Sequence, residues 1–403
     1  MASQRQELRV VSIVGLALLL RLAVVVVVAR GHSTSWFFDQ ATELGRLAES
    51  LRTGHGLSSP FGGSTGPSAF LSPGYPAIIA AVFGAFGALS ATSEYVIMTL
   101  QALFGAATVL VTMLFARRAF GVRVANTAGW ICALCPPALF LPTLFWETSL
   151  SILLATSLVA LAVRCATYSA TMSWVAMGLV SAAALAVNPS LLPIVVCGFG
   201  WAIYQVRTKS LAPAVAGVLL CVTLSVPWAV RNYNQLHAFI PLRSNVGYEL
   251  WQGNRVGSDG FFLAGLHPNV NVAEFQRYET LGEVGYMHEK LKLAEARIAE
   301  DRGWFLGLTA KRTFYFWTGI ARQSSSLVVA YITITTVFGF IGLIKLRRSD
   351  HSLAVYLLVT LMLFPIPYYI THPDYRFRLV VDPILVALAA VAVGPRKSED
   401  TSS

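Results

Sequence analysis

The sequence has few charged residues. Aspartate, glutamate, lysine and arginine make up 12% of its 403 residues, whereas soluble domains average about 25%. At the same time 55% of the residues are hydrophobic, and apolar runs of about 20 residues recur along the whole chain. So little charge cannot cover the surface of a water-soluble globule. The composition therefore predicts an all-α polytopic membrane protein with a single transmembrane domain over residues 1–403.

Several functional signatures are also missing. The sequence contains no Walker-type phosphate loop, no zincin pattern and no Rossmann fingerprint. No acidic cluster calls for a cation, so we expect no metal and no other cofactor. The Cys132-Ala-Leu-Cys135 pair has the spacing of zinc ligands but no accompanying histidine or second cysteine pair. We interpret it as small residues that pack between helices.

The net charge of +10 does not indicate a nucleic-acid partner. The basic residues cluster at the ends of apolar runs, where the positive-inside rule for membrane proteins accounts for them. We therefore expect membrane lipids, and no nucleic acid, around this chain. The clusters that we place on the cytoplasmic side are Arg5 and Arg9; Arg117, Arg118 and Arg123; Arg164; Arg207 and Lys209; Lys345, Arg347 and Arg348; Arg396 and Lys397.

The apolar runs predict about ten transmembrane helices. The first is interpreted as a retained span, because it is too long for a signal-peptide core and lacks a cleavage site. If the basic clusters are cytoplasmic, the number of spans between successive clusters must be even. This holds only if Tyr75–Leu89, which is too short to cross, lies beside the membrane as a juxtamembrane helix. The predicted spans are Val10–Ala29, Glu94–Phe115, Ala125–Pro142, Ser149–Arg164, Trp174–Val187, Leu191–Val206, Leu211–Pro227, Ser326–Leu346, Leu353–Tyr369 and Leu379–Val393.

This topology leaves two large loops on the outer face, residues 30–93 and 229–324, with both termini in the cytoplasm. The second loop is expected to contain helices. Glu274–Asp301 has helical spacing and no proline, and Gly303–Phe316 is an aromatic and basic amphipathic run suited to the membrane interface.

Two acids stand at the outer ends of spans. Asp39 is the first carboxylate after the first span, where an apolar boundary can tune the pKa of a general base; the alternative is a helix cap or a solvated loop acid. Glu147 lies in an otherwise apolar hairpin between two spans. It has fewer structural uses, although it could pair with Arg21 or another basic residue.

Four arginines need a reason for their positions. Arg21 lies near the middle of the first span, where an unpaired charge costs about 2.5–3.5 kcal/mol; it either pairs with a carboxylate or carbonyl and fixes packing, or faces a polar cavity. Arg231 closes another span. Arg376 and Arg378 break the positive-inside bias, so they bind either a substrate phosphate or lipid headgroups.

Polar and aromatic side chains accompany these charges. Asn188-Pro189 interrupts an apolar run and predicts an outer hairpin. Asn245, Trp251 and Asn254 lie in a segment without hydrophobic period, and such aromatic and amide groups suit sugars and phosphates. The alternative there is an interfacial aromatic belt. His372, alone, is a weak candidate.

Taken in order, these segments resemble the GT-C superfamily of membrane glycosyltransferases, and the branch with protein O-mannosyltransferases and the lipid A aminoarabinose transferase. The likeness covers nearly the whole chain. The segments that carry it are Leu19-Leu20-Arg21-Leu22, Asp39, Gly54-His55-Gly56-Leu57, Ser72-Pro73-Gly74-Tyr75-Pro76, Ala116-Arg117-Arg118-Ala119-Phe120-Gly121, Glu147, Pro227-Trp228-Ala229-Val230-Arg231-Asn232-Tyr233, Gly253-Asn254 and Arg376-Phe377-Arg378.

The resemblance implies a GT-C-like bundle that takes a sugar from a polyprenyl-phosphate donor and transfers it, with inversion, to a lipid, glycan or protein acceptor. It implies that this occurs on the outer face of a bacterial inner membrane, without a metal. Asp39 would be the general base, and Glu147 would position the acceptor or a donor-binding arginine. The residues implied at the donor phosphate are Arg376, Arg378, Arg231 and Arg21, and those at the substrate are Tyr75, Asn188, Asn245, Trp251, Asn254 and His372.

The sequence departs from that pattern at two positions. Gln40 follows Asp39 where relatives often have a second acid, and Asn188-Pro189 stands where many have Arg-Pro. Two other functions therefore stay open. One is a transporter or flippase for lipid-linked saccharides, although we find no repeat symmetry that would favour it. The other is a non-catalytic subunit of an envelope complex.

Overall fold

The computed structural model describes residues 2–168, 170–206, 211–320 and 324–394. This part of the chain is helical and has no named strand, as predicted. Seven helical segments in it are long and apolar enough to cross a membrane, so the chain is a polytopic integral membrane protein. They are α1 (Ala2–Gly31), α5 (Ala91–Phe120), α8 (Thr148–Tyr168), α10 (Leu192–Val206) with the preceding turn η2 (Pro189–Leu191), α11 (Leu211–Leu236), α15 (Ser326–Ser349), and α16 (His351–Leu363) with α17 (Ile366–Ile370).

The remaining predicted spans are bent or short. The span predicted over Ala125–Pro142 is bent, because α6 (Val122–Ala133) and the following Pro136–Thr143 segment meet at 55°. Pro136 and Pro137 follow the break, and proline removes the backbone bond that would continue α6. The count of about ten is reached by including this bent pair and two shorter apolar helices, α9 (Thr171–Val187) and α19 (Asp382–Val393).

The predicted span Leu211–Pro227 ends later in the structure, because α11 continues through Pro227 to Leu236. A proline inside a transmembrane helix removes one backbone hydrogen bond, and neighbouring groups can satisfy the freed carbonyl. The extra turns of α11 extend beyond the predicted end of the span.

Glycines allow the helices to approach one another closely. A methyl group at Gly342 of α15 would overlap the carbonyl of Leu388 in α19, and one at Gly178 of α9 would overlap the carbonyl of Gly217 in α11. Small residues at such contacts are typical of helix packing in membranes, where dispersion contacts replace the hydrophobic effect. These contacts fix the bundle that supports the loops.

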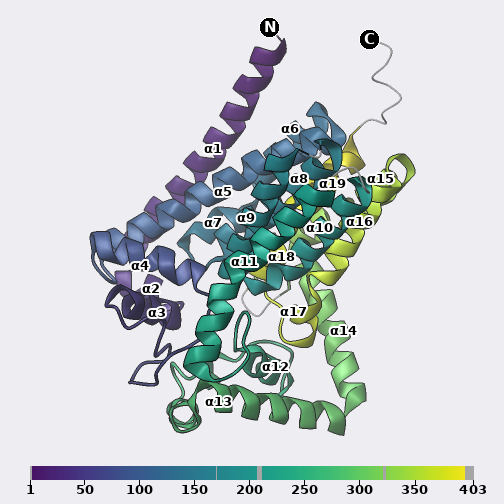
Figure 1. The fold of residues 1–403 in the computed structure, drawn as a ribbon. Helices are drawn as coiled ribbons and strands as arrows, with labels where there is room; N and C mark the ends of the chain where they lie inside the picture. Colours follow the sequence, from purple (N-terminus) through teal and green to yellow (C-terminus); the bar gives the residue numbers. More distant parts are fainter. Residues whose placement is uncertain (1, 169, 207–210, 321–323, 395–403) are drawn as a thin grey trace.

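The two long loops lie together at one end of the bundle, here called the loop end. The start of α1 and the end of α19 lie at the opposite end (Figure 1). Segment 30–93 contains α2 (Thr34–Asp39), α3 (Thr42–Arg52) and α4 (Gly74–Phe86), and segment 229–324 contains α12 (Val246–Asn254), α13 (Val272–Glu300) and α14 (Arg302–Thr318). Both helices predicted in the second segment are thus present. Of the predicted cytoplasmic clusters, Arg207, Lys209, Arg396, Lys397 and the side chain of Arg5 lie outside the described residues.

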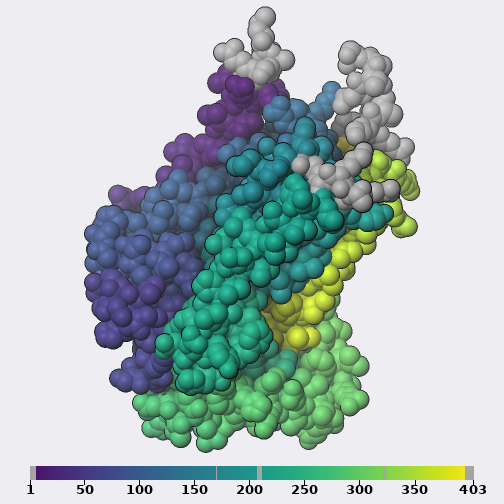
Figure 2. Space-filling view, in the orientation of Figure 1, coloured from purple at the N-terminus to yellow at the C-terminus, as the bar shows by residue number. Residues whose placement is uncertain are grey.

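The two loops form one layer. The side chain of Asn269 donates to Glu43 at 2.7 Å and accepts from Arg46 at 2.9 Å. The carboxylate of Glu283 accepts the backbone N–H of Ala69 at 2.7 Å. Figure 2 shows α13 and α14 as a continuous green base below the bundle. Side-chain contacts therefore join the two loops at the loop end.

Candidate active site

Asp39 and Glu147 lie on segments that one side chain joins. Gln40, directly after Asp39, donates to the carbonyl of Thr143 at 3.2 Å and accepts from the backbone N–H of Phe145 at 3.4 Å. Phe37 and Phe145 also pack, with ring centroids 5.0 Å apart. The end of α2 is therefore held against the hairpin that carries Glu147, although the two are 105 residues apart in sequence.

The carboxylate of Asp39 is not engaged by another described side chain or backbone group. It is the last residue of α2 and is exposed, and its carboxylate forms no hydrogen bond or ion pair within the described ranges. A carboxylate that already serves as a cap or salt-bridge partner would have to be released before it could accept a proton from a substrate. Asp39 needs no such release.

Glu147 is half-buried, and its negative charge affects the pKa of a buried tyrosine, Tyr75. Tyr75, near the start of α4, is buried and its hydroxyl has no hydrogen-bond partner. Burial raises the pKa of Tyr75, and the negative charge of Glu147 raises it further. The Tyr75 hydroxyl thus stays protonated and is free to donate to a ligand close to Glu147. Tyr368 is also within electrostatic range of Glu147.

Arg376 joins this group from the far end of the sequence. Its guanidinium lies 4.4 Å from the ring centroid of Trp146, the residue before Glu147. Its ion pair with Asp374 is long, at 3.8 Å, and its Nε has no hydrogen-bond acceptor. Stacked on an aromatic ring with donors to spare, Arg376 has the geometry of an anion-binding arginine.

Arg378 occupies a different environment. It is fully buried, and it donates to Asp382 at 2.7 Å and to the hydroxyls of Thr335 and Thr336 at 3.3 and 3.1 Å. These partners lie in α19 and α15, inside the bundle. Arg378 Nε has no hydrogen-bond acceptor, but the rest of the guanidinium is held in a buried ion pair, so the contacts favour packing. The phosphate assignment stays a prediction.

Arg231 and Arg21 both bind backbone carbonyls. Arg231 donates to Leu57 and to Ser68, each at 2.7 Å, and so holds the first loop against the end of α11. Arg21 donates to the carbonyls of Ala17, Cys132 and Ala133 at 2.9, 3.3 and 3.5 Å. Of the two uses foreseen for Arg21, the described contacts match pairing with carbonyls.

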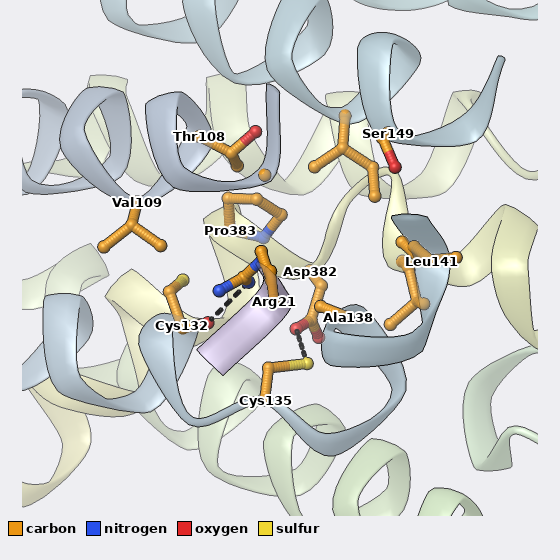
Figure 3. A pocket seen from close by; sticks show the side chains of 13 residues that line it. Arg21, Thr108, Val109, Cys132, Cys135, Ala138, Leu141, Ser149, Asp382 and Pro383 are labelled. Carbon is orange, nitrogen blue, oxygen red and sulfur yellow. Dashed lines mark hydrogen bonds between the residues drawn. The ribbon is translucent and has the colours of Figure 1, made fainter. Parts of the chain in front are cut away.

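Arg21 also lines a small cavity inside the bundle, but the cavity wall is mainly apolar, so the polar cavity foreseen as its second use stays a prediction. The cavity has a volume of about 40 Å³ and lies beside the α6–α7 break (Figure 3). Asp382 also lines the cavity, and its carboxylate accepts hydrogen bonds from Arg378 and Tyr331. The residues labelled around it are Arg21, Thr108, Val109, Cys132, Cys135, Ala138, Leu141, Ser149, Asp382 and Pro383.

His372 and Asn245 share one partner. The carboxylate of Glu249, on α12, bonds to His372 Nε2 at 2.9 Å and accepts from Asn245 Nδ2 at 2.8 Å. Burial alone would raise the pKa of Glu249, but the His372 hydrogen bond and the positive charge of Arg243 hold it below its usual range. Glu249 is thus an anion that ties α12 to the loop before Arg376.

The other predicted substrate residues are engaged within the protein. Asn188 accepts from the backbone N–H of Ser190 at 3.1 Å and donates to Ser151 at 3.3 Å. The ring of Trp251 lies 3.9 Å from the ammonium nitrogen of Lys290. Asn254 is fully buried and donates to the carbonyl of Ile370 at 2.8 Å. These contacts position α12 and the η2 turn, and contact with substrate stays a prediction.

Sequence reasoning missed the residues that assemble the loop end. Gln40 was noted only as a departure from the family pattern, and Glu249 and Trp146 were not singled out. Arg312 of α14 is fully buried and donates to the carbonyls of Gly253, Gly260 and Ile370. Burial lowers the pKa of Arg312 to about 10. A charge inside an amphipathic run was the only available signal, and it does not reveal the partners.

Within the described ranges no group of three or more histidine, cysteine, aspartate or glutamate side chains could hold a metal ion. The cysteines of the Cys132-Ala-Leu-Cys135 pair are free and buried beside the α6–α7 break. Their thiols therefore lie within the bundle packing.

Comparisons with known proteins bear on the fold. No family profile matches the sequence, and no curated protein matches it. Solved structures of the oligosaccharyltransferase from Archaeoglobus fulgidus do match. One, with zinc and sulfate, gives a TM-score of 0.58 at 13% identity over 94% of this chain and 48% of that one. Another, tethered to an acceptor peptide containing the NVT sequon, gives 0.56 at 13% identity over 95% and 49%.

The chain therefore spans about half the length of the oligosaccharyltransferase chains it matches. ArnT from Cupriavidus metallidurans also matches, at 14% identity over 93% of this chain and 77% of that one, with a TM-score of 0.37; this likeness carries no part of the assignment. The archaeal matches show that the chain shares the fold of the matched part of those oligosaccharyltransferase chains, which agrees with the bundle that the resemblance in the sequence implied.

Proposed function

We propose that the chain is a membrane glycosyltransferase that moves a sugar from a polyprenyl-phosphate donor to an acceptor at the loop end. The observation that carries the proposal is the convergence of three distant segments on one place. The uncommitted carboxylate of Asp39, the half-buried Glu147 and the stacked Arg376 belong to segments that Gln40 and Trp146 hold together. An archaeal oligosaccharyltransferase of the same fold is described in complex with a dolichol-phosphate, which is a lipid of this class.

The chemistry assigns one role to each group. The Asp39 carboxylate takes a proton from the hydroxyl or amine of the acceptor, whose heteroatom attacks the anomeric carbon. The bond from that carbon to the phosphate oxygen breaks, and its electron pair leaves with the polyprenyl phosphate, so the configuration inverts. Arg376 stabilises the negative charge on the departing phosphate. Glu147 and the Tyr75 hydroxyl orient the sugar or the acceptor.

The orientation is part of the proposal. We place the loop end on the outer face of a bacterial plasma membrane, and both termini in the cytoplasm. Basic residues at the opposite end of the bundle, such as Arg117 and Arg347, are exposed and follow the positive-inside rule. A donor with its sugar on the outer leaflet would then reach Asp39 directly.

The test is transfer by the purified chain in lipid vesicles supplied with a panel of polyprenyl-phosphate sugars and candidate lipid, glycan and peptide acceptors. Release of polyprenyl phosphate is measured by chromatography. Asp39→Asn removes the proton acceptor while keeping the size of the side chain, so we expect turnover to fall by about 10²-fold or more. Glu295→Gln, which alters an exposed acid of α13, is the matched control and should turn over like the unaltered chain.

Equal turnover by Asp39→Asn and the unaltered chain would falsify the role of Asp39 as base. Movement of intact donor across the vesicle membrane without release of polyprenyl phosphate would instead identify a flippase. If the chain neither transfers nor moves any donor in the panel, the proposal of an enzyme is rejected in favour of a subunit of an envelope complex.

A further inference from the structure

The backbone between α6 and α8 is irregular although it lies within the bundle. Between Ala133 and Thr148 the chain forms only the five-residue α7 (Pro136–Phe140) and the turn η1 (Leu141–Thr143). Such a segment has carbonyl groups without helical partners, and within a membrane each of them needs another donor. The source of these donors determines where the hairpin, and so Glu147, is held.

Three side chains from other elements supply the donors. Arg21 of α1 binds the carbonyls of Cys132 and Ala133, at the point where α6 ends. Gln101 of α5 donates to the carbonyls of Pro142 and Leu144 at 3.2 and 2.8 Å. Gln40 binds the same hairpin from the end of α2, at Thr143 and Phe145.

The packing around Arg21 is specific to this arrangement. Arg21 is 2% exposed and Gln101 is 1% exposed, so neither side chain is bonded to bulk water instead. Gly105 of α5 leaves room for the guanidinium, because a methyl group there would lie 2.6 Å from Arg21 Nε. Figure 3 shows Arg21 reaching the α6 end beside the cavity, with its bond to Cys132. The buried guanidinium of Arg21 thus makes its contacts with the broken span, at the end of α6.

We propose that Arg21 and Gln101 are positioning residues that hold the α6–α7 break and thereby set the place of Glu147. Arg21 fixes the start of the irregular segment. Gln101 fixes its end at Leu144, which comes two residues before Trp146 and three before Glu147. The carboxylate then meets Tyr75 and the Arg376–Trp146 pair at one position. This inference rests on the proposed function only for the role of Glu147 in transfer.

Spin-label distances test the positioning without any activity. One label is placed at the end of α7 by Phe140→Cys and the other at the start of α9 by Met172→Cys, because both side chains are exposed, at 53% and 75%. Cys197→Ala removes the native thiol that is not buried. We expect a single narrow distance in this background, and a shifted or broadened one after Arg21→Met or Gln101→Met.

Two further variants separate position from stability. Gly105→Ala keeps the charge of Arg21 but displaces it, and should change the distance as Arg21→Met does, which keeps the test open if Arg21→Met does not fold. Trp201→Phe removes a bond from α10 to Ser352 of α16, at 3.0 Å, on elements that carry neither label, and should leave the distance unchanged. Unchanged distances in all of the Arg21, Gln101 and Gly105 variants would overturn the inference.

A double-mutant cycle then tests the link to Glu147. Displacing a group by about 1 Å can cost about 10²-fold in rate, so Arg21→Met should lower kcat/KM for transfer by up to that factor. If Arg21 acts through Glu147, adding Arg21→Met to Glu147→Gln should cause little further loss, whereas Trp201→Phe should act independently of Glu147→Gln. Full additivity with Glu147→Gln contradicts the inference. Absence of transfer in the unaltered chain rejects the proposed function and leaves the distance test intact.

Discussion

Arg376 and Arg378 are separated by one residue and have unlike surroundings. Both lie in the short helix α18 (Tyr375–Leu379). Residues two apart in a helix point about 200° from one another, so one guanidinium stacks on Trp146 while the other enters the bundle and binds Asp382. The sequence predicted two outer arginines of one kind because it did not predict α18. The structure distinguishes an arginine stacked on an aromatic ring from one with a buried carboxylate partner.

This difference predicts opposite outcomes for one substitution at the two positions. Arg378→Met leaves the buried carboxylate of Asp382 without its cation, and breaking a buried pair in this way costs about 3–5 kcal/mol. Arg376→Met removes a partly exposed group with one long ion pair, so stability should stay near that of the unaltered chain. Thermal unfolding of the purified variants in detergent measures both. A melting temperature for Arg378→Met equal to that of Arg376→Met contradicts the assignment of Arg378 to packing.

At the scale of elements, close contacts between backbones hold the loop layer to the bundle. A methyl group at Gly253, near the end of α12, would overlap the carbonyl of Thr371 and press on Arg312. Arg312 itself joins α14 to α12 and to the end of α17 through backbone carbonyls. The position of α12 against the loop that carries His372 and Arg376 therefore depends on the absence of a side chain at residue 253.

Gly253→Ala should loosen this contact. Forcing a methyl group into a packed contact costs about 1–3 kcal/mol, and the strain falls on the junction between α12 and residues 369–372. Hydrogen exchange followed by mass spectrometry should show faster exchange in peptides from both segments. Gly265→Ala is the matched control, because a methyl group there meets no atom within 4 Å. Exchange at the junction that is identical in the two variants argues against the role of Gly253.

The elements also mark the limit of prediction from sequence. Hydropathy predicted the long spans because a run of apolar residues is a local property, and helical spacing predicted α13 and α14 for the same reason. The break between α6 and α7 was missed although Pro136 and Pro137 were visible, because the donors that make the break tolerable, Arg21 and Gln101, come from other helices. Contacts of this kind become visible only in three dimensions.

At the scale of the whole molecule, the pairing of spans placed the two loops on one side, and the structure brings both of them to one end of the bundle (Figure 1). That arrangement followed from the distribution of lysine and arginine. The distribution of charges could not show that Gln40 joins Asp39 to the Glu147 hairpin, since a side-chain amide can form hydrogen bonds with many kinds of group. By their contacts the predicted residues divide into two groups, and substrate binding by either group stays a prediction. Asp39, Glu147, Tyr75 and Arg376 lie on the segments joined around the Glu147 hairpin, whereas the side chains bonded within the protein are Arg21, Arg231, Arg378, Asn188 and Asn254.

The central claim is that the whole chain transfers a sugar from a lipid phosphate. Mass spectrometry of the lipids and glycoconjugates of cells that carry the chain, compared with the same cells without it, tests this most directly. In cells without the chain, or with Asp39→Asn in its place, we expect a polyprenyl-phosphate sugar to accumulate and one glycoconjugate to lose the mass of that sugar. Identical lipid and glycoconjugate profiles with and without the chain would contradict the account.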